Sequence, residues 1–358
     1  MSNARATAAE TGSLDTFPRL LMNHARQRPN RPAMREKEYG IWQTYTWAEV
    51  AERVRSIASG LAELGFRRGD RLAVVGDNRP RLYWSVAAAQ CLGGIPVMMY
   101  QDAVAQEMAY VMQDAEIRFA CVEDQEQVDK MLEIKGDLPL LEHVIYDDPR
   151  GLRHYNQTFL HGLDELLEMG RIHDQNHPDF LGNEIDKGSP DDVSVMLYTS
   201  GTTGKPKGVC QSHAAFIAAA RGGCSFDSLT DQEDILSYLP MAWVGDHLFS
   251  YAQALVAGFT INCPESGETV MGDLREIGPT YYFAPPRVFE NLLTQVMIRM
   301  EDASSIKRSV FQHFMDVAKR CGADILDGKP VSAGDRLQYA LGNILVYGPL
   351  KNVLGMSR

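Results

Sequence analysis

The feature that most constrains the fold is an alternation of short apolar runs with longer helical patterns. The runs lie at 72–75, 96–99, 118–122 and 143–146, and the helical patterns at 81–91 and 105–112. Strands separated by helices of about 10–15 residues form βαβ units, in which neighbouring strands are parallel and buried on both faces. The alternation therefore predicts an α/β fold built on mostly parallel sheets.

The segments around this core have their own signals. Residues 1–14 are small and polar, which predicts a disordered tail before the ordered chain begins at residue 15. Thr46 and Glu49 match a capping box at the start of an amphipathic pattern that Gly65 closes, so a helix is expected there. The stretch 147–192 is rich in Asp, Asn, His and Gly, which predicts a long surface connection with one helix at 159–167.

The alternation resumes after this stretch. Strands are expected at 193–198, 235–238, 259–263 and 281–283, with a helix at 214–220. Proline is favoured at the first position of a helix, so Pro286 is expected to open a helical region. Apolar residues at 289, 292, 293, 296 and 300 form one stripe of its first helix, and further helices are expected at 305–321 and from 335 onward.

Composition excludes some functions. The chain has 35 Lys and Arg against 47 Asp and Glu, a net charge of −12, which argues against general binding of nucleic acids. The six cysteines are scattered and lack zinc-ligand spacing, so reduced thiols in a cytoplasmic protein are expected. No stretch approaches the roughly 20 apolar residues of a membrane span, while peripheral membrane contact and the oligomeric state stay open.

The most informative segment is a loop rich in glycine and hydroxyl residues, YTSGTTGKPKG at 198–208. Glycines let the backbone approach an anion closely, hydroxyls add donors, and the lysines add positive charge. The loop does not match a Walker A motif, because Pro206 follows the Gly204-Lys205 pair where Ser or Thr is required. It predicts a polyphosphate site of another kind, and the alternative is an ordinary surface turn.

The segment TSGTTGKPKG closely resembles the phosphate-binding loop of the adenylate-forming, or AMP-binding, superfamily, which includes acyl-CoA synthetases and luciferases. YTWAEV at 45–50, the segment 69–97 and LPMAWVGDH at 239–247 are similar to further parts of these proteins. APPRVFENLL, followed by EDASSIKRSVF at 301–311, resembles the long-chain acyl-CoA synthetase branch. The resemblance implies a layered αβαβα adenylation domain over residues 15–358.

The resemblance also implies parts that this sequence does not contain. Members of the superfamily continue beyond the position of Arg358 into a Glu that helps to hold Mg²⁺ and an Asp that binds ribose, and then into a small C-terminal lid domain with a catalytic Lys. None of these can be assigned here. The chain is therefore expected to be an N-terminal fragment, truncated before the lid and with a sheet that is incomplete at its C-terminus.

The function that the resemblance implies is a two-step ligation. A long-chain fatty carboxylate attacks ATP to give acyl-AMP and pyrophosphate, and CoA then forms the thioester. Both reactants of the first step are anions, so catalysis depends on positioning and charge neutralisation, with Mg²⁺ shared with the phosphates. Two alternatives stay open. One is an acyl-AMP ligase that loads a carrier protein, and the other, if 358 residues is the natural length, is a non-catalytic nucleotide-binding remnant.

The resemblance also implies roles for individual residues of this sequence. Thr202 and Lys205 are the expected catalytic residues, and no metal ligand is assigned. Trp243 stands where many relatives have His; it is expected either to gate an acyl tunnel or to pack in the core. His247 is placed with Trp243 in the substrate pocket, although a lone His is more often structural. The expected phosphate-binding residues are Thr199, Ser200, Gly201, Thr202, Thr203, Gly204, Lys205 and Lys207.

Overall fold

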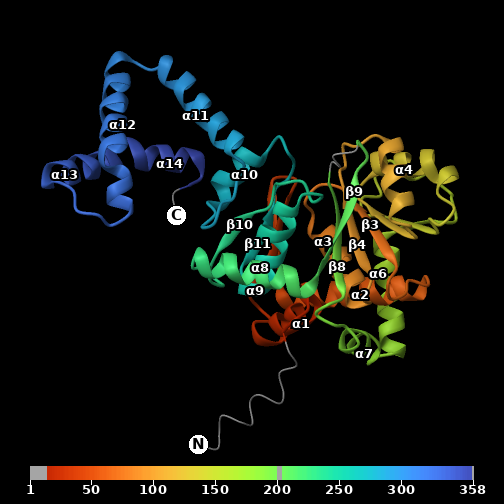
Figure 1. Cartoon of the computed structure of the whole chain (residues 1–358). Coiled ribbons are helices and arrows are strands. Elements are labelled where there is room, and N and C mark those ends of the chain that lie inside the picture. The colour runs from red at the N-terminus through yellow and green to blue at the C-terminus, as the bar shows by residue number, and fades with distance from the viewer. Residues whose placement is uncertain (1–13, 200–203, 357–358) are drawn as a thin grey trace, which may run out of the picture. The chain divides into compact units, whose positions relative to one another are not determined.

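The computed structural model describes residues 14–199 and 204–356 (Figure 1). The chain divides into two compact units, Met1–Gly267 and Glu268–Arg358. The tail predicted at 1–14 lies outside the described residues except for Leu14. No helix within the described ranges is long and apolar enough to cross a membrane.

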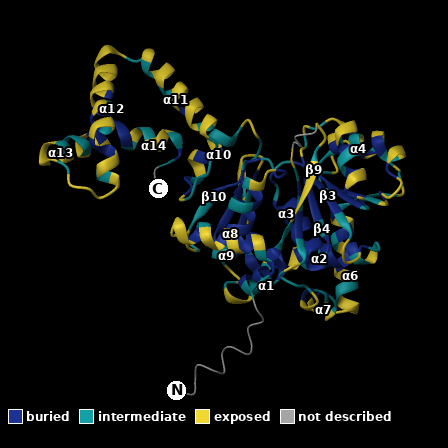
Figure 2. Ribbon diagram, in the orientation of Figure 1, coloured by how far each residue is buried: buried dark blue, intermediate teal, exposed yellow. Residues whose placement is uncertain are grey.

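The larger of the two sheets in the first unit has seven strands, in the order β7-β6-β5-β3-β4-β8-β9. All neighbouring pairs are parallel except β8 and β9. The interior strands are dark blue in Figure 2 because helices cover both faces, which explains their continuous apolar runs. The strands are β3 (Arg71–Val75), β4 (Ile95–Met99), β5 (Phe119–Val122), β6 (His143–Tyr146), β7 (Leu160–Gly162), β8 (Val193–Thr199) and β9 (Lys207–Ser212).

A second sheet has the order β10-β11-β1-β2. β1 pairs antiparallel with β2 and parallel with β11, so the two mostly parallel sheets confirm the predicted α/β class. The β1–β2 turn places Tyr39 and Gly40 in the left-handed region, at φ 48° and 75°, as a two-residue hairpin turn requires. The strands are β1 (Pro32–Glu38), β2 (Ile41–Thr46), β10 (Asp234–Leu236) and β11 (Thr260–Cys263).

The helices of the first unit cover these sheets. The predicted capping box opens α2: Thr46 N–H donates to the Glu49 carboxylate at 2.7 Å, and Glu49 N–H donates to Thr46 Oγ1 at 3.3 Å. The predicted helices at 81–91, 105–112 and 214–220 are confirmed as α3, α4 and α8. The helices are α1 (Phe17–Gln27), α2 (Trp47–Glu63), α3 (Pro80–Cys91), α4 (Ala105–Asp114), α5 (Gln125–Ile134), the 3₁₀ turn η1 (Lys135–Asp137), α8 (His213–Phe226), the π-helix η2 (Asp246–Ala252) and α9 (Gln253–Ala257).

The stretch 147–192 differs from the predicted surface connection. It contains the edge strand β7 and the helices α6 (Leu163–Asn176) and α7 (Phe180–Asp186), and the helix predicted at 159–167 begins later and runs longer. α6 packs closely on α2: a Cβ added to Gly170 would lie 1.7 Å from the backbone oxygen of Ser56. The polar composition hid this packing, because few side chains of α6, among them Leu163 and Leu166, are buried.

The second unit is helical, and Pro286 opens α11 as predicted. The stripe predicted on α11 buries only Leu292, since Phe289 and Leu293 are exposed. The strand predicted at 281–283 is wrong: only Tyr281 forms a bridge, and the three side chains are half-buried. The helices are α10 (Val270–Ile277), α11 (Pro286–Glu301), α12 (Ser305–Leu326), α13 (Ala333–Gly342), the π-helix η3 (Asn343–Tyr347) and α14 (Gly348–Leu354).

Candidate functional site

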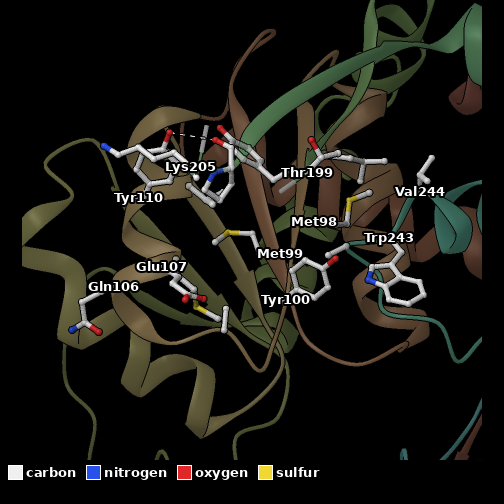
Figure 3. Close-up of a pocket in the computed structure, with 18 of the residues that line it drawn as sticks. Met98, Met99, Tyr100, Gln106, Glu107, Tyr110, Thr199, Lys205, Trp243 and Val244 are labelled. Carbon is white, nitrogen blue, oxygen red and sulfur yellow. Dashed lines mark hydrogen bonds between the residues drawn. The ribbon is translucent and has the colours of Figure 1, made fainter. Parts of the chain in front are cut away.

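A cavity of about 890 Å³ lies at the carboxyl ends of β4 and β8. Ligands of open α/β sheets bind outside the carboxyl ends of the strands, so this is where a site is expected. Its other walls come from α4, from residues 204–206 and from residues 242–245 (Figure 3). The cavity brings Thr199, Gly204, Lys205 and Trp243, four of the residues singled out in the sequence, to one place.

The strands on either side of the glycine-rich loop, β8 and β9, pair antiparallel. Thr199 at the end of β8 pairs with Lys207 at the start of β9, so a strand follows the loop and not the helix of a Walker A motif. Gly204 has a φ of +88°, a conformation that favours glycine. Lys207 is exposed in β9 and is not among the residues that line the cavity. Ser200, Gly201, Thr202 and Thr203 lie outside the described residues.

Helix α4 holds the described end of the loop. The Lys205 ammonium lies 5.2 Å from the centre of the Tyr110 ring, a cation–π distance. The Tyr110 hydroxyl donates to the Pro206 carbonyl at 3.3 Å, so one side chain of α4 contacts two consecutive loop residues. Figure 3 shows Lys205 and Tyr110 together at one side of the cavity. The loop thereby brings positive charge to this wall.

Trp243 lies at the rim, close to Tyr100 at the end of β4 (Figure 3). It is 40% exposed, so it does not belong to the packed core. Burial raises the pKa of Tyr100, and a hydrogen bond from the Trp243 side chain opposes that rise. Trp243 and Tyr100 therefore lie next to each other at the rim, which makes the rim position, and not core packing, the interpretation that the geometry favours.

His247 does not lie with Trp243. It is 2% exposed and is not among the residues that line the cavity. Its ring packs against Phe216 at 4.8 Å, Tyr251 at 5.0 Å and Phe17 at 6.0 Å. Burial lowers the pKa of His247 to about 3, which keeps the ring neutral. The structure thus places His247 in the core, and its expected place in the substrate pocket is corrected.

Sequence reasoning missed the rest of the cavity wall. Met98, Met99 and Tyr100 come from the carboxyl end of β4, and Met108 and Tyr110 come from α4. The expected strand at 96–99 offered a signal for the first three, because the carboxyl ends of neighbouring parallel strands lie at one edge of a sheet. The methionines give the cavity an apolar lining beside the cationic loop. An amphiphile with a negatively charged end suits such a wall.

The remaining reactive groups are the potential metal ligands and the cysteines. Within residues 14–199 and 204–356 there is no group of three or more His, Cys, Asp or Glu residues that could hold a metal ion. The described side chains therefore form no protein cage for Mg²⁺. All six cysteines are unpaired and five are buried, which confirms the expected thiols; Cys210 in β9 is exposed.

Comparison with known proteins relates this geometry to a family. The family model described as AMP-binding enzyme matches residues 21–349. The chain is 26% identical over 341 residues to the rat long-chain-fatty-acid–CoA ligase ACSBG1, covering 92% of this chain and 45% of the relative. It is 28% identical over 336 residues to the Xenopus laevis ligase ACSBG2, covering 91% and 44%. The chain thus spans about half the length of the curated relatives that it matches.

Solved structures show the same fold. The anthranilate CoA ligase AuaEII in complex with anthranoyl-AMP superposes with a TM-score of 0.66 at 18% identity, covering 78% of this chain and 51% of that one. A putative long-chain-fatty-acid CoA ligase from Rhodopseudomonas palustris gives a TM-score of 0.64 at 18% identity, with 78% and 65% covered. The match of the family model over most of the sequence, together with this fold, shows that the chain belongs to the AMP-binding enzyme family.

Proposed function

We propose that the gene product is an AMP-forming fatty acid–CoA ligase, and that this chain supplies its ATP loop and its acyl-binding wall. The observation that carries the proposal is that one cavity is lined both by the loop bearing Lys205 and by a wall of methionines. The family match supports acyl-adenylate chemistry, and the relatives named above are long-chain-fatty-acid–CoA ligases.

The proposed chemistry follows from the charges. A fatty carboxylate oxygen attacks the α-phosphorus of ATP, the bond to the bridging oxygen breaks, and pyrophosphate leaves with the electron pair. Lys205 and the loop hydroxyls neutralise negative charge on the phosphates, while the methionine wall holds the acyl chain. Mg²⁺ enters with the nucleotide in this proposal, and no step is assigned to it. The thiol of CoA then displaces AMP to form the thioester.

The phosphate site proposed here is the whole loop, Thr199–Lys205 together with Lys207, with Thr202 and Lys205 as the catalytic residues. The adenylation domain is proposed to extend over residues 15–358, the two units included. The unpaired and mostly buried thiols support a cytoplasmic location, because disulfides are rare in that compartment.

Product analysis tests this function. The full gene product is incubated with ATP, Mg²⁺ and a long-chain fatty acid, with CoA, with a phosphopantetheinyl carrier protein, or with neither. We expect acyl-AMP without an acceptor, and AMP with acyl-CoA when CoA is present. A thioester on the carrier alone would instead identify an acyl-AMP ligase, and the absence of both acyl-AMP and AMP would contradict the proposal.

The rim residue gives a first prediction. Trp243→Ala is expected to raise the KM for a long-chain fatty acid about tenfold and to leave the KM for ATP within about twofold, because the indole contact with the acyl chain is lost. Trp42→Ala, the same change in β2, is the control. Steady-state kinetics with both variants measure the effect. Equal KM values for the acid in Trp243→Ala and the wild type would exclude Trp243 from the acyl path.

A further inference from the structure

A buried polar network lies directly behind the cavity wall that carries Trp243. Its centre is Asp246, which is 1% exposed and follows the cavity-lining residue Gly245. The carboxylate accepts hydrogen bonds from Asn78 Nδ2 at 3.0 Å, from the Tyr83 hydroxyl at 2.7 Å and from Ser237 Oγ at 3.0 Å. Asp246 is therefore a fixed point at the end of the wall segment 242–245.

The three donors come from separate parts of the first unit. Asn78 lies in the turn after β3, Tyr83 in α3, and Ser237 after β10, so the network links the carboxyl ends of strands from both sheets. The donor groups also lie within hydrogen-bonding distance of one another: the Tyr83 and Ser237 oxygens at 2.7 Å, and Asn78 Nδ2 and the Tyr83 oxygen at 2.9 Å. Because each hydroxyl has one proton, the contact between the two hydroxyls is an alternative to one of their bonds to Asp246. A connected network of this kind favours one arrangement of the elements that it joins.

The charge of Asp246 makes the network unusual. The three donors described above are neutral groups, and burial raises the pKa of Asp246 to about 7. A buried carboxylate without a cationic partner is unfavourable unless several donors satisfy it. Asp246 also begins the π-helix η2, and short π-helical segments occur frequently at functional sites.

The turn after β3 reaches the other half of the rim as well. Asp77 Oδ1 accepts a hydrogen bond from Gln101 Nε2 at 2.7 Å, and Gln101 follows Tyr100, the partner of Trp243. Two consecutive residues thus bond to both sides of the rim: Asp77 to Gln101, which follows Tyr100, and Asn78 to Asp246, three residues after Trp243.

We infer that Asp246 is a positioning residue, which acts through residues 242–245 to hold Trp243 against Tyr100 and so sets the affinity for the acyl substrate. The substrate part of this inference rests on the proposed function; the positioning part does not. Asp246 touches no reacting atom in this role. Its removal should change the place of Trp243 while leaving the ATP loop intact.

Fluorine NMR of the full gene product labelled with 5-fluorotryptophan tests the positioning. Trp243→Phe identifies the Trp243 resonance. Asp246→Asn and Tyr83→Phe are expected to shift or broaden that resonance and to leave those of Trp42 and Trp47 unchanged. The matched control is Tyr155→Phe, which removes the same hydroxyl from a 2.6 Å bond to a carboxylate outside the network, that of Asp129 in α5.

Steady-state kinetics of the same variants test the consequence. Asp246→Asn and Tyr83→Phe are expected to raise the KM for a long-chain fatty acid about tenfold, the order of effect of losing one buried hydrogen bond, with kcat and the KM for ATP within about threefold. If the Asp246→Asn variant does not fold, the Tyr83→Phe variant is used instead, because this change removes only one oxygen atom.

The outcomes separate this inference from the proposed function. An unmoved Trp243 resonance in the folded variants would overturn the positioning role, and a parallel rise of both KM values would overturn the selective effect on acyl binding. A wild-type protein without fatty-acid-dependent turnover would overturn the proposed function, while the NMR shifts would still test the position of Trp243.

Discussion

Thr202→Ala is expected to lower the rate of fatty-acid-dependent ATP–pyrophosphate exchange by about 10²–10³, the usual effect of losing one preorganised donor to a developing oxyanion. Thr202 belongs to the loop between β8 and β9, whose described residues Gly204 and Lys205 line the cavity. The hydroxyl is proposed to donate to a phosphate of ATP. Exchange of labelled pyrophosphate into ATP, measured on the full gene product, checks the prediction.

Two further variants show whether a loss of exchange comes from the loop and from Thr202 itself. Thr158→Ala changes an exposed threonine outside the loop and should leave exchange unchanged. Lys205→Ala removes the charge at the cavity wall and should also lower exchange. A normal rate in Thr202→Ala with a low rate in Lys205→Ala would remove Thr202 from the site and keep the loop. Normal rates in both would contradict the proposed phosphate site.

The second large effect concerns stability. Gly170→Ala is expected to lower the free energy of unfolding by about 3 kcal/mol, the upper part of the usual range for overpacking. The added Cβ would lie 1.7 Å from the backbone oxygen of Ser56 and 2.7 Å from the backbone nitrogen of Gly60. Backbone atoms of α2 cannot move aside as a side chain would, so α2 and α6 must separate.

Gly182→Ala in α7 is the matched control, because nothing lies within 4 Å of the Cβ that it would add. This change should be neutral or slightly stabilising, since alanine favours a helix by up to about 1 kcal/mol over glycine. Urea unfolding of both variants measures the difference in midpoint. Equal midpoints would show that the close contact of α2 and α6 does not bear on stability.

Local sequence signals predicted much of the first unit. The buried strands of the seven-stranded sheet are continuous apolar runs, and the capping box of Thr46 and Glu49 marks the start of α2. By contrast, β1 and β2 were missed. β1 reads PAMREKE, and it pairs with the adjacent β2 as well as with β11, more than 220 residues away, where Met34 is paired to Ile261. Four of its seven residues are charged, so the strand lacks the continuous apolar run that marks the buried strands.

Some residues of the candidate site could likewise be predicted from the sequence, and others could not. The loop and Trp243 were found through a resemblance of contiguous motifs, and the cavity brings the described loop residues and Trp243 together. The same motif suggested that His247 would join Trp243, but η2 turns it into the core against Phe216. Tyr100 and Tyr110 were missed because only the assembled sheet and α4 bring them to the cavity.

Fatty-acid-dependent ATP–pyrophosphate exchange by the full gene product, without CoA, tests the central claim most directly. The reaction isolates adenylate formation, the step proposed for the cavity at the ends of β4 and β8. We predict exchange that requires a long-chain fatty acid and is lost in Lys205→Ala. Exchange that occurs equally without an acid, or no exchange with any acid by a folded protein, would contradict the proposal that this cavity activates fatty carboxylates.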